Sequence, residues 1–280
     1  MKRCIKGKSC GATCIDPRER CVLELGPSIS NPTTKVASML QQRSSGGAGG
    51  GSPSAPTINS LMTENLRGAA ETYVRMFDYR LDKHRKAGEQ VFGKDPEKLA
   101  RWNSDINPLA KLSDAQKAAV GFYGENVRQY YKDVNQFLRS GQRPEKPETD
   151  SVVRFTAQNL KEGLARLPAE PKDLQRAVSG NFATQLGNLK VGSVIEDKGF
   201  GSYTDKGSPT LNSFISKTEL NAVLMVKSKT ARDVSRVMEF DEGEHLSMPG
   251  TKYRVVDIAP EGFYSRKTGG YVPTYTLEEV

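Results

Sequence analysis

The sequence predicts an α+β fold, in which a helical N-terminal part is followed by a strand-rich part. In the first half of the chain, apolar residues recur every three to five positions, which is the spacing of the buried face of an amphipathic helix. In the second half, short apolar or alternating segments are bounded by Gly, Pro and Asp, as strands and turns are. Because the helices come first and the strands follow, the pattern indicates an α+β domain.

Local signals mark where the helices begin and end. Pro96 suits the first turn of a helix, where a backbone N–H has no partner to lose. Ser113 and Gln116 form the sequence of a capping box, which opens a helical region. Gly and Pro residues interrupt the pattern at 141–147, and Pro168 closes the last helix. The expected helical ranges are 59–103 with a second helix over 96–102, then 113–138 and 152–167.

Strands are expected from residue 174 onward. The segments with strand composition are 174–178, 191–195, 222–227, 244–248, 253–258 and 271–277. The sequence Gly-Phe-Gly-Ser-Tyr-Thr at 199–204 is either a hairpin turn or a strand on which Ser202 and Thr204 face the same side.

The first 43 residues form a separate, cysteine-rich head, followed by a linker at 44–57 that holds five Gly, four Ser and two Pro. All four cysteines of the chain lie in this head, at Cys4, Cys10, Cys14 and Cys21. Their spacing admits a tetrahedral zinc site, two disulfides or unpaired thiols, and the sequence leaves these alternatives open. A helical segment at 58–110 follows the linker.

The net charge of +8 is concentrated in the head, which holds eight basic and three acidic residues. The rest of the chain is near neutral and shows no basic stripe with interleaved aromatics, so nucleic-acid binding is expected at most through the head. The apolar runs are too short to cross a bilayer, and the basic start lacks the apolar stretch of a secretory signal peptide. Neither a membrane partner nor Sec export is expected.

Charged residues in the strand-rich half suggest a ligand site. Arg176 lies in an apolar segment, where it is either an exposed edge residue or an anchor for an anion such as pyrophosphate. Glu242 and Glu244 project from one face at the start of a strand, which is costly unless a cation or polar partner compensates. An acidic surface loop is the alternative. Paired carboxylates are also what glycosidic-bond chemistry uses.

The order Arg176, then GFGSYT, then EGE resembles the R-S-E class of arginine-directed mono-ADP-ribosyltransferases. The segment LSDAQKAAVGFYGENVRQYYKDVNQFLRSG resembles that family's opening helices, and EGEHLSMPGTKYRVVDI resembles its E-x-E strand with the following turn and strand. The resemblance runs from Leu112 to the C-terminus. It implies a catalytic domain at 111–280 with a mixed β-sheet core of the ADP-ribosyltransferase type.

The resemblance also implies NAD as the substrate and gives roles to individual residues. Arg176 would grip a phosphate or ribose of NAD, and Ser202 would open the family's Ser-Thr-Ser motif. Glu244 would be the catalytic glutamate, and Glu242 the upstream carboxylate that accompanies an arginine acceptor. Further cofactor-binding residues would be Ala177, Thr204 and Phe214, with the ring of Phe214 against the nicotinamide. Tyr203 and Thr204 depart from the motif, and His84 and His245 receive no catalytic role.

The chemistry of these residues agrees with that implication. Cleaving NAD between ribose and nicotinamide leaves an oxocarbenium-like ribose, so a carboxylate on the 2′-hydroxyl stabilises the transition state most. That role suits Glu244, with Ser202 orienting the carboxylate. Glu242 would bind an incoming guanidinium and favour loss of its proton. No metal is required for these steps.

The predicted function is therefore NAD-dependent protein-arginine mono-ADP-ribosylation with release of nicotinamide, with NAD and a target protein carrying an acceptor arginine as partners. One alternative is an NAD glycohydrolase, with water as the acceptor. Another is a catalytically inactive virion or interaction protein whose Cys-rich head does the binding. By analogy of architecture, the chain is expected to be an effector that acts in the cytoplasm of another cell, delivered from a phage virion or, as a toxin, by a dedicated secretion machine.

Overall fold

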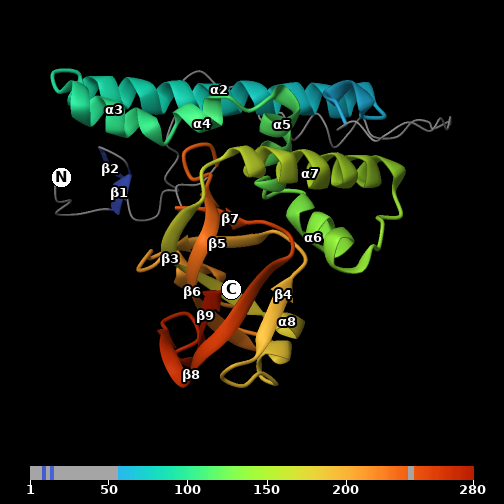
Figure 1. Ribbon diagram of the computed structural model, residues 1–280, viewed down its shortest axis with the longest axis vertical. Coiled ribbons are helices and arrows are strands. Elements are labelled where there is room, and N and C mark those ends of the chain that lie inside the picture. Colours follow the sequence, from blue (N-terminus) through green and yellow to red (C-terminus); the bar gives the residue numbers. More distant parts are fainter. Residues whose placement is uncertain (1–7, 11–12, 16–55, 239–242) are drawn as a thin grey trace. The chain divides into compact units, whose positions relative to one another are not determined.

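The computed structural model describes residues 8–10, 13–15, 56–238 and 243–280, and the chain divides into two units, Met1–Gln42 and Arg43–Val280 (Figure 1). In the first unit, strands β1 (Lys8–Cys10) and β2 (Thr13–Ile15) form an antiparallel pair. The boundaries given above for head, linker, helical segment and catalytic domain remain predictions.

Helices occupy the first half of the second unit. They are the 3₁₀ helix η1 (Ile58–Ser60), α2 (Glu64–Phe92), α3 (Pro96–Ser104), α4 (Asn107–Ala110), α5 (Asp114–Tyr123), α6 (Tyr130–Ser140) and α7 (Pro147–Arg166). The capping box is confirmed, because the Gln116 amide donates to Ser113 Oγ and the Ser113 amide donates to Gln116 Oε1. None of the described helices is long and apolar enough to cross a membrane.

The helical region after Ser113 does not run on to Leu138, as its apolar pattern predicted, but breaks between α5 and α6. The carboxylate of Glu125 accepts hydrogen bonds from the backbone amides of Val127 and Arg128 at 3.0–3.2 Å, which ends the helical hydrogen-bond ladder. Gln129 then takes a left-handed conformation with φ of 54° before α6 begins. This break turns the ends of both helices toward the strands.

The strands follow in the order expected. They are β3 (Glu170–Ser179), β4 (Val194–Asp197), β5 (Gly201–Asp205), β6 (Asn221–Asp233), β7 (His245–Ser247), β8 (Thr251–Ser265) and β9 (Gly270–Glu279), with short helices α8 (Gly180–Leu186) and α9 (Leu211–Phe214) between them. The sheet order is β3-β5-β7-β6-β9-β8-β4, and β3 also pairs with β6. Only β6 and β9 are parallel among the described pairs, so the sheet is mixed, and the α+β prediction is confirmed.

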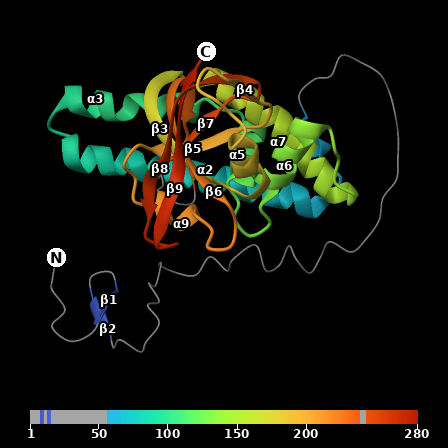
Figure 2. The same cartoon turned by 90° about the horizontal axis from the view of Figure 1, so that it is seen from below.

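The two halves of this unit form two layers, with the long helices on one side of the strands (Figures 1 and 2). One core joins the helices to the strands and includes Phe122 and Phe155 of the helices together with Phe200 and Leu246 of the strand region. A second core lies within the sheet and contains Tyr203. Tyr123 of the first core and Tyr203 of the second both line the pocket described next.

Candidate active site

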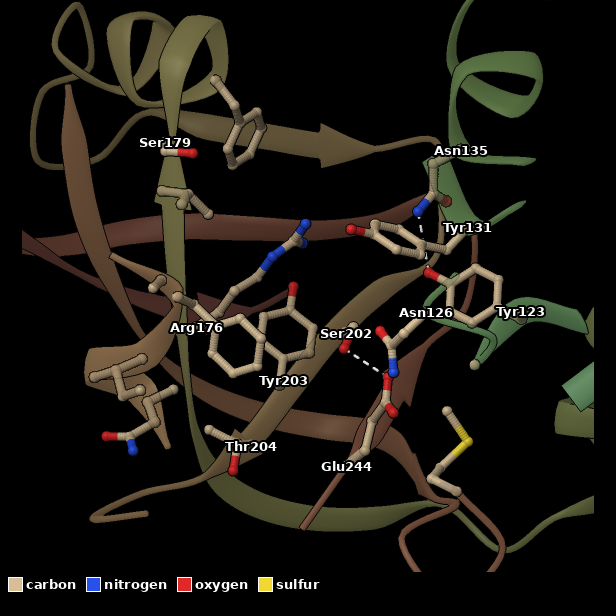
Figure 3. Close-up of a pocket in the computed structure, with 18 of the residues that line it drawn as sticks. Tyr123, Asn126, Tyr131, Asn135, Arg176, Ser179, Ser202, Tyr203, Thr204 and Glu244 are labelled. Atoms are coloured by element: carbon tan, nitrogen blue, oxygen red, sulfur yellow. Dashed lines mark hydrogen bonds between the residues drawn. The ribbon is translucent and has the colours of Figure 1, made fainter. Parts of the chain in front are cut away.

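A pocket of about 420 Å³ opens between the end of α5, one side of α6, the strands β3 and β5, and Glu244, which directly precedes β7 (Figure 3). This volume lies within the ~300–1,000 Å³ typical of small-molecule sites. Every sequence-predicted site residue of the described strand region lines it, namely Arg176, Ala177, Ser202, Thr204, Phe214 and Glu244. The topology therefore brings together three motifs that are far apart in the chain.

Glu244 directly precedes β7 and is held by contacts to both its side chain and its backbone. Ser202 Oγ donates a 2.7 Å hydrogen bond to Glu244 Oε1 across the β5–β7 pair. The backbone amide of Val234 donates to the Glu244 carbonyl at 3.0 Å. The carboxylate is therefore oriented within the pocket, with its second oxygen not engaged by Ser202.

Arg176 points from β3 into the other end of the pocket (Figure 3). Its guanidinium lies 5.7 Å from the ring centroid of Tyr203 and 5.9 Å from that of Phe182. Its Nη1 atom is 3.7 Å from Asp197 Oδ2 and, among the described residues, has no hydrogen-bond partner. A buried, charged donor without a hydrogen-bond partner is a ready site for an anionic ligand.

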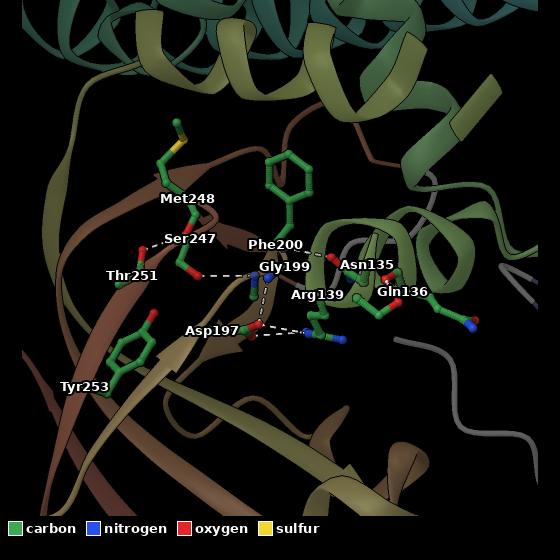
Figure 4. A network of polar contacts seen from close by, with 12 residues as sticks. Asn135, Gln136, Arg139, Asp197, Gly199, Phe200, Ser247, Met248, Thr251 and Tyr253 are labelled. Carbon is green, nitrogen blue, oxygen red and sulfur yellow. Dashed lines mark hydrogen bonds and ion pairs between the residues drawn. The ribbon is translucent and has the colours of Figure 1, made fainter. Parts of the chain in front are cut away.

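A second arginine of the pocket, Arg139 of α6, is held by the same aspartate. Arg139 Nε and Nη2 donate to the two carboxylate oxygens of Asp197 at 3.0 and 3.1 Å (Figure 4). The Gly199 amide also donates to Asp197 Oδ1, at 2.9 Å. One buried carboxylate thus orients two guanidinium groups along the pocket wall, which suits the two phosphates of a dinucleotide.

Tyr203, the departure from the family motif, belongs to the sheet core. Its hydroxyl lies 3.2 Å from the hydroxyl of Tyr253, and its ring supports the Arg176 guanidinium. Burial raises the pKa of the Tyr203 phenol, so the side chain stays neutral. The large residue between Ser202 and Thr204 therefore lies against Arg176, and the Ser202–Glu244 hydrogen bond forms beside it.

The helices contribute pocket residues that the sequence reasoning missed. Asn135 Nδ2 donates to the hydroxyl of Tyr123 at 3.0 Å, and Asn135 Oδ1 accepts from the Phe200 amide at 2.7 Å. Burial raises the pKa of the Tyr123 phenol, which keeps that group protonated. Asn126 and Tyr131 line the same wall. The signal that was available in the sequence is the density of Tyr and Asn between residues 123 and 135.

Some predicted site residues lie outside the described part of the structure. Glu242 falls in the segment 239–242, and the side chains of the four head cysteines are likewise not described. Among the residues that are described, no group of three or more His, Cys, Asp or Glu side chains is arranged to hold a metal ion. Phe214 lines the pocket with 52% of its surface exposed, so its ring is available for contact.

Comparison with known proteins agrees with this geometry. No protein-family model matches the chain. The chain is 25% identical over 189 residues to the NAD(+)–protein-arginine ADP-ribosyltransferase Tre1 of Pseudomonas putida (strain GB-1), a match that spans 64% of this chain and 34% of Tre1. The chain thus covers about a third of the length of that relative.

Among solved structures, the chain resembles the Vis toxin, an ADP-ribosyltransferase from Vibrio splendidus, with a TM-score of 0.51 and 16% identity over 75% of this chain and 85% of Vis. Vis has also been solved in complex with agmatine, and that structure matches with a TM-score of 0.51 and 15% identity over the same shares of the two chains. These likenesses show the fold, which is that of the ADP-ribosyltransferases. The resemblance predicted from the sequence is confirmed by these comparisons.

Proposed function

We propose that this chain, which has the ADP-ribosyltransferase fold, transfers ADP-ribose from NAD to an arginine of a target protein and releases nicotinamide. The observation that carries the proposal is the Ser202–Glu244 hydrogen bond of 2.7 Å in the same 420 Å³ pocket as Arg176. The fold and the arginine-directed relative support the same reaction.

Arg176 and Arg139 bind the pyrophosphate of NAD. Both guanidinium groups are oriented by Asp197, so little side-chain freedom is lost when the anion binds. Phe214 covers the nicotinamide end. With the dinucleotide anchored in this way, the ribose that joins pyrophosphate and nicotinamide comes within reach of Glu244, which lines the same pocket.

Glu244 acts on the bond that breaks. The C1′–N bond between ribose and nicotinamide opens, its electron pair leaves with neutral nicotinamide, and positive charge develops on the ribose. A carboxylate bonded to the ribose 2′-hydroxyl is most stabilising at that moment, because its interaction strengthens as the charge grows. Ser202 holds Oε1 of this carboxylate, and Oε2 is the oxygen that would bind the ribose 2′-hydroxyl.

Glu242 acts on the acceptor. A guanidinium is protonated at neutral pH and is a poor nucleophile, so a carboxylate that binds it and accepts its proton promotes attack on C1′. The complex of Vis with agmatine, a small guanidine, supports a guanidinium acceptor for this fold, and the name of Tre1 supports a protein arginine. If water takes the acceptor's place, the same site hydrolyses NAD.

The two glutamates give the experiment that tests this function. Nicotinamide release and label incorporation into an arginine-rich acceptor are measured for the wild type, Glu244→Gln and Glu242→Gln. Glu244→Gln should lose both reactions by about 100-fold or more, as loss of an electrostatic stabiliser does. Glu242→Gln should lose transfer while slow hydrolysis persists. Full transfer by Glu242→Gln refutes arginine specificity, and hydrolysis by Glu244→Gln refutes the catalytic assignment. Absence of NAD cleavage by the wild type would favour the inactive binding protein.

The remaining parts of the chain serve delivery and targeting in this proposal. The head at 1–43, tethered by the linker at 44–57, binds a partner, and the helical segment and catalytic domain act in the target cell as those of a toxin or effector do. A bound zinc ion and a pair of disulfides remain the two candidate groups that would stabilise the head. Metal analysis of the purified protein distinguishes them.

A further inference from the structure

The buried side chain of His245 contacts the turn that leads into Glu244. Gly243 has a left-handed backbone with φ of 64°, and a Cβ atom at this position would lie 3.2 Å from Asp205 Oδ2. The Gly243 carbonyl is 2.9 Å from Nδ1 of His245, whose side chain is only 1% exposed. The peptide that immediately precedes the catalytic glutamate thus has a side-chain partner.

The tautomer of the His245 ring follows from its neighbours. Its Nε2 atom lies 3.2 Å from Nζ of Lys172, which in turn is 2.7 Å from Asp205 Oδ1. An ammonium group has only donors, so Nε2 accepts and carries no proton. In the tautomer that this geometry favours, the ring proton is on Nδ1, where it is donated to the Gly243 carbonyl.

This contact adds a restraint on the Gly243–Glu244 peptide. Ser202 fixes the Glu244 carboxylate and Val234 fixes the Glu244 carbonyl, but both act on the C-terminal side of the Gly243–Glu244 peptide. His245 is the described side chain that holds the carbonyl of that peptide itself. Without it, the glycine is free to rotate about ψ, because it has no side chain to restrict it.

We propose that His245 is a positioning residue for the reaction: with its proton on Nδ1, it fixes the Gly243–Glu244 peptide, through which the chain connects the two glutamates of the E-x-E motif. Lys172 and Asp205 set the tautomer. The inference rests on the proposed function. It goes further by predicting that arginine transfer, which needs both carboxylates in register, depends on His245 more than NAD hydrolysis does.

Two substitutions distinguish the roles of the two ring nitrogens of His245. In His245→Asn the amide nitrogen replaces Nδ1 and still donates to the Gly243 carbonyl. In His245→Gln the amide reaches the position of Nε2 near Lys172 and leaves that carbonyl without a donor. We expect transfer to fall about 10-fold in His245→Gln, as for one lost hydrogen bond at a buried group, with the KM for NAD unchanged. His245→Asn should retain most of the transfer activity.

The controls make the result specific. His84→Asn and His84→Gln carry the same changes at the other histidine of the chain, on α2, and should leave both reactions unchanged. Thermal unfolding confirms that each variant is folded. Equal transfer by His245→Asn and His245→Gln, or a loss that falls equally on hydrolysis and transfer, would overturn the proposal.

A measurement that needs no activity tests the tautomer separately. In ¹⁵N-labelled protein, the imidazole shifts of His245 should show protonation at Nδ1, and Lys172→Met should reduce that preference. Lys206→Met is the matched control, because Lys206 also pairs with an aspartate on the neighbouring strand, Asp173, at 3.6 Å. If the wild-type His245 carries its proton on Nε2, the inference is refuted even where arginine transfer is found. If the wild type does not transfer ADP-ribose to arginine, the proposed function is refuted even where the tautomer is correct.

Discussion

Replacing Asp197 with asparagine tests whether one carboxylate organises the anion-binding end of the pocket. Asp197 is 8% exposed, accepts two hydrogen bonds from Arg139 and one from the Gly199 amide, and lies 3.7 Å from Arg176. Asparagine keeps the shape, but its amide N–H groups face the guanidinium donors. Both arginines then lose the partner that orients them.

The expected size of the effect follows from this geometry. Breaking a buried ion pair costs about 3–5 kcal/mol. Arg139 is 38% exposed, so water recovers part of that loss, and we expect the free energy of unfolding to fall by about 2–3 kcal/mol. Since the pyrophosphate is held alike in the ground state and the transition state, the KM for NAD should rise about 10- to 100-fold with little change in kcat.

Denaturant unfolding and the kinetics of nicotinamide release measure these two quantities on the same protein. Asp173→Asn is the matched control, because Asp173 is 59% exposed and pairs loosely with Lys206, as surface pairs worth under about 1 kcal/mol do. It should change neither quantity appreciably. A loss of stability in Asp197→Asn with an unchanged KM for NAD would show that the arginines are structural and do not bind the dinucleotide.

Three further outcomes are expected. Arg176→Lys should weaken NAD binding by calorimetry, because an ammonium cannot reproduce the bidentate fork; unchanged affinity would make Arg176 structural. A protein that begins at Ile58 should fold and cleave NAD with wild-type kinetics, and an insoluble or inactive product would contradict the predicted head and linker. Burial raises the pKa of Glu279, but hydrogen bonds from Thr230 and the Lys229 amide outweigh burial and hold it below its usual value. The wild type should therefore be more stable than Glu279→Gln at neutral pH, and this difference should shrink as the pH falls and the Glu279 carboxylate is protonated. A difference in melting temperature between the two proteins that does not depend on pH would refute this prediction.

Helix starts were predictable because their signals are local. The capping box at Ser113 fixes where α5 begins, and Pro96 stands at the first turn of α3. The break after Tyr123 was not predictable, because the apolar spacing continues across it to Tyr130. What ends the helix is the Glu125 carboxylate on two backbone amides, and such a competing hydrogen bond leaves no trace in hydrophobic periodicity.

The residues of the candidate site fall into the same two groups, those that the sequence predicted and those that it did not. Arg176, Ser202 and Glu244 were found because the order of their three segments along the chain resembles a family pattern, and all three line the pocket. Arg139 and Asp197 were missed because each looks like an ordinary surface charge in its own element. Their ion pair joins residues 58 positions apart and exists only because the end of α6 packs beside the end of β4. Pairings of this kind are set by tertiary structure, which local patterns do not encode.

The N-terminal helices, which show no chemistry in the sequence, also contact the chain that leads to the site. Arg80 of α2 donates a 2.7 Å hydrogen bond to the carbonyl of Val237, and the guanidinium of Arg236 lies 5.4 Å from the ring centroid of Trp102 on α3. Val234, at the start of this segment, holds the carbonyl of Glu244. The helices therefore brace the connection between β6 and β7 that leads to Glu244. This continuity argues that the helical segment and the strand-rich part act as one unit, in which the helices fix the described part of the connection between β6 and β7.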